Sequence, residues 1–136
     1  MASLIPQELN WVEKRAACTV ATVFNQLCDG IKADVEAINA ALHLTEKNLF
    51  QADIHSDGTT IIVGQPNVVP RKRLYIGTNG ERIQVFQEWD KTKWSATIGL
   101  NDEGRCTLRL DSVQELEQWQ FRKKALEGLF FGEVGL

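Results

Sequence analysis

The sequence has few of the residues that build metal or catalytic sites. Only two of its 136 residues are histidine, and the three cysteines, Cys18, Cys28 and Cys106, form no Cys-x-x-Cys pair. A zinc site needs closely spaced Cys and His ligands, and a disulfide framework usually leaves no odd cysteine. We therefore expect no metal and no cofactor, and we expect the cysteines to be buried free thiols of a cytoplasmic protein.

Long apolar runs and a strong charge of either sign are also lacking. No run approaches the ~18–20 apolar residues that a membrane-spanning helix needs. Fifteen basic and eighteen acidic residues give a net charge of −3, which argues against nucleic acid as a partner. Because 43% of the residues are hydrophobic, the sequence predicts one globular domain over residues 1–136 with a packed core.

The first third of the chain has the periodicity of a helix. Apolar residues recur every three or four positions from Leu9 through Val12, Ala16 and Val20 to Leu42. This spacing predicts one long helix over about residues 5–42. Trp11 falls on the opposite, charged side of that helix. A large aromatic side chain on a charged face is typical of an interface.

The middle of the chain alternates between apolar and polar residues, as strands do. We expect six strands within residues 48–110, at about 48–54, 59–64, 71–76, 82–89, 94–100 and 105–110. The pair Asn79-Gly80 between two alternating segments is a strong hairpin signal. Short turns join the strands, so the sheet is expected to be an antiparallel meander.

A second helix is predicted after the last strand, over about residues 112–130. Ser112 and Glu115 have the spacing of a capping box. With two amphipathic helices and one apolar sheet face, we expect an α+β domain whose curved sheet is covered by helices on one side.

The chain around this second helix is similar to the close of a pleckstrin-homology-like domain. The resemblance covers about 25 residues: a strand ending in Leu108-Arg109-Leu110, a capped helix start, and Trp119 within that helix. Domains of that family use seven strands, whereas six are expected here, and the long leading helix has no counterpart in them. No function or binding residue is carried over.

The sequence offers few groups of residues that could form an active site. Asp53 and His55 share a strand face, and Asp57 follows in an Asp-Gly turn. A solvated strand end explains these residues as well as an acid–base pair or a metal site would, and two ligands are too few for a closed site. We name no catalytic residue and do not expect an enzyme.

More apolar surface is present than one sheet face can cover, which favours a protein-interaction domain, with a homodimer as the simplest arrangement. The interface candidates are Trp11, Phe121, Leu129 and Phe131. Trp11 lies on the first predicted helix, Phe121 lies off the main apolar stripe of the second, and Leu129 and Phe131 belong to the apolar C-terminal segment.

Two alternatives remain open. A small apolar or amphipathic ligand could be carried between the curved sheet and the long helix, with Phe24, Trp89 and Trp94 as pocket candidates. The sheet face turned away from the helices could instead hold an anion or another partner. Its candidates are Arg73, Tyr75, Phe86, Arg105 and Arg109.

Overall fold

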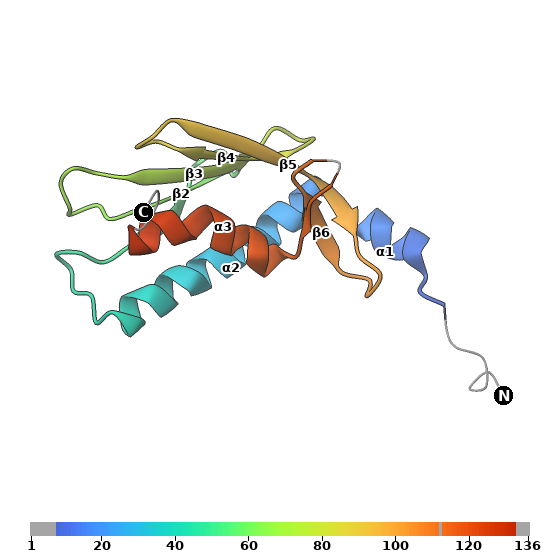
Figure 1. The fold of residues 1–136 in the computed structure, drawn as a ribbon, viewed down its shortest axis with the longest axis horizontal. Helices are drawn as coiled ribbons and strands as arrows, with labels where there is room; N and C mark the ends of the chain where they lie inside the picture. The colour runs from blue at the N-terminus through green and yellow to red at the C-terminus, as the bar shows by residue number, and fades with distance from the viewer. Residues whose placement is uncertain (1–7, 112, 133–136) are drawn as a thin grey trace.

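A computed structural model describes residues 8–111 and 113–132 and shows helices packed on one face of an antiparallel sheet (Figure 1). The predicted α+β class is confirmed. Within the described ranges the elements are α1 Trp11–Ala17, α2 Val20–Ala41, β1 Gln51–Ile54, β2 Thr60–Gly64, β3 Arg73–Thr78, β4 Ile83–Gln87, β5 Thr92–Leu100, β6 Cys106–Arg109, β7 Glu115–Leu116 and α3 Gln118–Phe131.

The N-terminal helix is divided rather than continuous, and residues 5–7 of the predicted span lie outside the described residues. Helix α1 ends where the backbone N–H of Cys18 donates to the carbonyl of Arg15. Thr19 then begins α2, because its hydroxyl accepts from the backbone N–H of Thr22. The apolar spacing runs through this break, so the sequence pattern did not reveal it.

The strands form a meander in which each strand pairs with the next, as predicted, in the order β1-β2-β3-β4-β5-β6-β7. Six of them overlap the expected segments, although β3 extends two residues further, to Thr78, and β5 begins two residues earlier, at Thr92. The seventh, β7, was missed because it is only two residues long and pairs with β6 across a turn. Asn79-Gly80 forms the expected turn between β3 and β4, where Gly80 has φ +92°.

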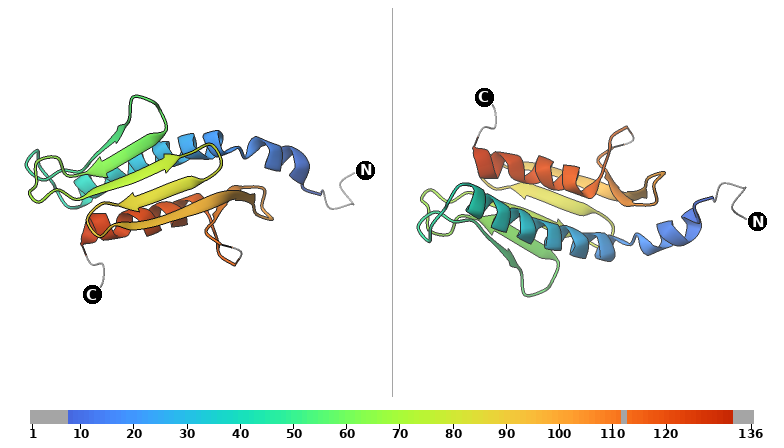
Figure 2. Two further views of the ribbon diagram at one scale, coloured as in Figure 1. Left: turned by 90° about the horizontal axis from the view of Figure 1, so that it is seen from above. Right: turned by 90° about the horizontal axis from the view of Figure 1, so that it is seen from below.

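Helices α2 and α3 lie side by side on one face of the sheet and run in the same direction (Figure 2). Close approach is possible at Gly30, where an added Cβ would lie 2.6 Å from the guanidinium of Arg122. That guanidinium donates to Asp34 at 2.8 Å. No helix in the described part of the chain is long and apolar enough to cross a membrane.

The core fills the space between the helices and this inner face. Alternate strand residues, among them Ile61, Leu74, Ile76 and Val85, are fully buried against Leu27 and other α2 residues. Burial of these side chains is the main stabilising contribution to the fold. The intervening strand residues point to the other face, which we call the outer face.

Helix α3 begins later than predicted. Ser112 lies outside the described residues, and Asp111 accepts from the backbone N–H groups of Val113 and Gln114 to form a turn. The helix starts at Gln118, with a capping box made by Glu117 and Gln120. Pairing of β7 with β6 therefore replaces the first predicted turn of helix.

The prediction of three free thiols was wrong for two of them. Cys18, between α1 and α2, forms a disulfide with Cys106 at the start of β6. The two residues are 88 positions apart, so no sequence spacing indicated the pair. Cys28 is free and buried, and its burial raises the pKa of the thiol to about 11.

Candidate functional site

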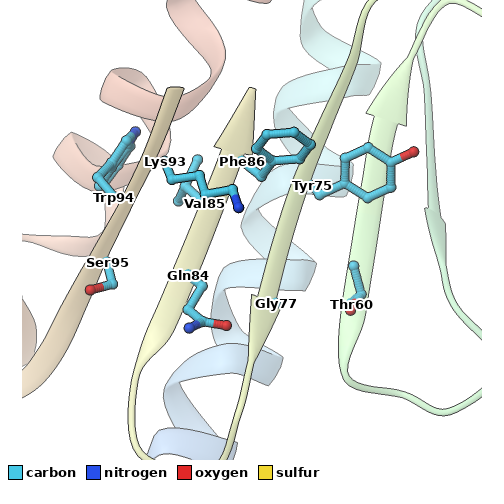
Figure 3. Close-up of a pocket in the computed structure, with 9 residues that line it drawn as sticks. All are labelled: Thr60, Tyr75, Gly77, Gln84, Val85, Phe86, Lys93, Trp94 and Ser95. Carbon is cyan, nitrogen blue, oxygen red and sulfur yellow. The ribbon is translucent and has the colours of Figure 1, made fainter. Parts of the chain in front are cut away.

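No helix of the described residues covers the outer face of the sheet over β2, β3 and β4, where it forms a shallow depression of about 660 Å³ (Figure 3). In Figure 3 the rings of Tyr75 and Phe86 lie on this face, with Gln84 and Ser95 further along β4 and β5. Gly77 has no side chain, so the surface is lower there than at its cross-strand partners Thr60 and Gln84. The strand alternation predicted from the sequence placed Tyr75 and Phe86 here correctly.

Tyr75 and Phe86 form what we call the aromatic platform. They are direct cross-strand partners on β3 and β4, with ring centroids 6.0 Å apart and ring planes inclined by 35°. Aromatic pairs in this distance range attract each other beyond their buried area. Both rings are half-buried, so each keeps exposed surface for a ligand.

An ion pair fixes one end of this platform. Arg73 donates two hydrogen bonds of 3.0 Å to Glu88, and the Tyr75 hydroxyl donates a third at 3.2 Å. The hydrogen bonds from Arg73 hold the pKa of Glu88 below its ordinary value. Burial raises the pKa of Tyr75, so the hydroxyl stays protonated and remains a donor.

Two lysines extend the platform on its other side. The ammonium groups of Lys91 and Lys93 lie 5.8 Å and 5.4 Å from the centroid of the Phe86 ring. Such positions are typical of cation–π contacts. Neither lysine takes part in an ion pair among the described residues. The sequence pattern indicated arginines on this face and not these two lysines, although Lys93 has the strand phase of Ser95.

The other two arginine candidates do not join the platform. Arg105 pairs with Glu117 at 2.9 Å, and Arg109 pairs with Glu115 at 2.7 Å. Arg109 lies on β6 and Glu115 on β7, whereas Arg105 precedes β6 and Glu117 caps α3. Their charges are therefore neutralised locally and do not add to the outer face near Phe86.

A second candidate surface lies on the helical layer. Helices α2 and α3 form an apolar depression of about 400 Å³, which we call the helix groove. Its lining residues are Asp34, Ala37, Ile38, Ala41, Trp119, Arg122, Lys123, Leu126, Glu127, Phe130 and Phe131. Trp119 and Phe131 are each 53% exposed, a large apolar surface to leave in water.

The four interface candidates divide into two pairs. Trp11 on α1 is 62% exposed and Phe131 on α3 is 53% exposed, as an interface requires. Phe121 is fully buried and Leu129 nearly so, because both point from α3 into the core. These two side chains offer no surface to a partner in this fold. Trp119 takes their place on the exposed side of α3.

The three pocket candidates do not surround an opening between the sheet and α2. Phe24 is buried in the core, and Trp89 packs against the core from its edge. The Trp94 ring lies 5.1 Å from that of Phe121, and Trp94 also lines the depression on the outer face (Figure 3). The depressions described above lie on the two outer surfaces of the molecule.

Of the remaining polar candidates, His55 and Asp57 lie close together in the turn after β1. His55 and Asp57 are exposed and 3.4 Å apart, and a hydrogen bond from the backbone N–H of Thr59 lowers the pKa of Asp57. Among the described residues, no group of three or more His, Cys, Asp or Glu side chains could hold a metal ion.

Comparison with known proteins does not assign this chain to a family. No family model matches it, and neither the curated proteins nor the solved structures give a match.

Proposed function

We propose that this protein is a non-enzymatic interaction domain that forms a homodimer through the helix groove. The observation that carries the proposal is the pair of exposed aromatic side chains, Trp119 and Phe131, in an apolar groove built by two helices. Aromatic residues seated in an apolar, water-excluding surface contribute most of the binding energy of typical interfaces.

The charges around the groove favour a second copy of the chain as the occupant. Asp34 and Glu127 balance Arg122 and Lys123, so the groove as a whole is electrically neutral. A twofold interface brings the same surface together from both subunits, and it tolerates only self-complementary charge. Lys123 and Glu127, 3.4 Å apart on one face of α3, can exchange partners across such an axis.

The disulfide indicates the kind of compartment in which such a dimer would function. The sequence favoured the cytoplasm, where disulfides are rare because thiols are kept reduced. The Cys18–Cys106 bond supports an oxidising compartment instead. We therefore propose an oxidising compartment, and not the cytoplasm, as the location of the protein.

Native mass spectrometry and light scattering on the oxidised protein test the dimer. The wild type is expected to have the mass of two chains. Trp119→Glu puts a charge into the groove, and loss of a central Trp weakens an interface by about 2 kcal/mol or more, which is roughly 30-fold in the dissociation constant. The variant is expected to be a monomer with an unchanged circular dichroism spectrum.

Trp11→Glu is the matched control, since Trp11 is also an exposed helical Trp but lies on α1. It is expected to remain a dimer. A monomeric wild type would overturn the proposal. The proposal would also be overturned if Trp11→Glu dissociated the dimer while Trp119→Glu left it intact, because the interface would then involve α1.

A further inference from the structure

The outer face of the sheet has the features of a binding site that does not depend on the helix groove. The aromatic platform presents two rings in direct cross-strand register, 6.0 Å between centroids. The Arg73–Glu88 ion pair holds the Tyr75 hydroxyl, and therefore the ring, in place before any ligand arrives. A surface that is already ordered loses little conformational entropy on binding.

The charge near the platform is positive. Residues 71–110 hold eight basic and five acidic side chains, and two of the eight, Arg105 and Arg109, are paired with Glu117 and Glu115 away from the platform. Glu88, the acid beside Tyr75, is neutralised by Arg73. Lys91 and Lys93 lie against Phe86, and no ion pair of the described residues engages them. The complementary ligand is an aromatic ring system that carries negative charge.

The shape of the site selects among such ligands. Small molecules bind in pockets that enclose most of their surface. The outer face is an open depression, in which Gly77 leaves room beside the rings and Gln84 and Ser95 supply polar groups (Figure 3). A flexible strand can spread its contacts over such a face, with bases stacked on the rings and phosphates against cations.

We propose that the outer face binds single-stranded nucleic acid by stacking bases on Tyr75 and Phe86 and holding the backbone with Lys91 and Lys93. The net charge argued against nucleic acid at the sequence level. The structure adds an arrangement that composition does not contain, because it places two neighbouring aromatic rings and two lysines, neither in an ion pair with a described residue, on one surface. Binding is expected to be weak at physiological salt, since few phosphates are contacted.

Fluorescence anisotropy with a labelled single-stranded oligothymidine is the test. Phe86→Ala is expected to weaken binding about tenfold, the typical loss for one stacked base, without changing the salt dependence. Lys93→Gln is expected to reduce the slope of log K against log salt by about 0.7, the value for one phosphate contact on a single strand. The two variants thus separate stacking from charge.

Lys32→Gln is the matched control, because Lys32 is an exposed residue of α2 and its loss changes the net charge equally. It is expected to bind as the wild type does. Absence of binding by the wild type at low salt would overturn the proposal, and so would equal affinity for a duplex of the same length. Equal weakening by Lys32→Gln and Lys93→Gln would also overturn it, since the attraction would then be unspecific. Thymidine monophosphate binding as tightly as the oligonucleotide would reject a strand as the ligand.

Discussion

The two faces of the sheet are made by the same strands, yet they are stabilised in different ways. On the inner face, aliphatic side chains such as Ile61 and Ile76 are fully buried beneath α2 and α3. On the outer face, Tyr75, Phe86, Arg73 and Glu88 hold one another through ring contacts and hydrogen bonds while remaining partly in water. The inner face therefore carries most of the folding energy, and the outer face can carry binding groups at little cost to stability.

Removing one phenylalanine ring from the core beneath the sheet and one from its outer face gives the largest expected effect. Phe121→Ala takes away a fully buried ring that packs on Trp94, and should lower the free energy of unfolding by about 3–5 kcal/mol. Phe86→Ala removes a half-exposed ring and one aromatic pair, and should cost about 1 kcal/mol. Urea unfolding followed by circular dichroism measures both. Equal losses would contradict the division between the faces.

Loss of the disulfide should give the next effect, because it ties the start of the helical layer to β6. In the chain-entropy account, a bond closing a separation of 88 residues restricts the unfolded chain. A Cys18→Ser/Cys106→Ser double variant should lose about 2–4 kcal/mol.

Dithiothreitol provides the control for the disulfide. It should lower the unfolding midpoint of the wild type to that of the double variant, and it should leave the double variant unchanged. Alkylation of the unreduced, unfolded wild type should label Cys28 alone. Labelling of all three cysteines would show that the bond does not form.

The smallest effect concerns the ion pair of the outer face. A carboxyl whose pKa is lowered on folding stabilises the fold above its unfolded pKa, and that contribution is lost as the pH falls through the folded pKa. Arg73→Gln should therefore raise the pKa of Glu88 toward its ordinary value. The stability that Glu88 loses as the pH falls should then be smaller.

NMR titration of the Glu88 carboxyl carbon measures that shift. Tyr75→Phe is the graded comparison, because it removes only the weaker hydrogen bond to Glu88 and should raise the pKa less than Arg73→Gln does. A larger rise in Tyr75→Phe would mean that the hydroxyl, and not the guanidinium, stabilises the carboxylate.

Much of the strand arrangement could be predicted from the sequence. Alternation between apolar and polar residues follows from having one buried and one open face, so Tyr75 and Phe86 were placed together correctly. Helix α3 was harder to predict. Two sets of α3 residues repeat at helical spacing: one is Phe121, Ala125 and Leu129, and the other contains Trp119. Only packing decides which set faces the core.

The sequence by itself determined the local features of this protein: the strand and helix periods, the Asn79-Gly80 turn and the order of elements. These depend on neighbours within a few positions along the chain. Only the tertiary structure decided the Cys18–Cys106 bond, the break before α2, the pairing of β7 and the exposure of Trp119. The disulfide and the exposure of Trp119 depend on contacts between distant segments, whereas the break before α2 and the pairing of β7 are short-range features. None of these four features leaves a periodic pattern in the sequence.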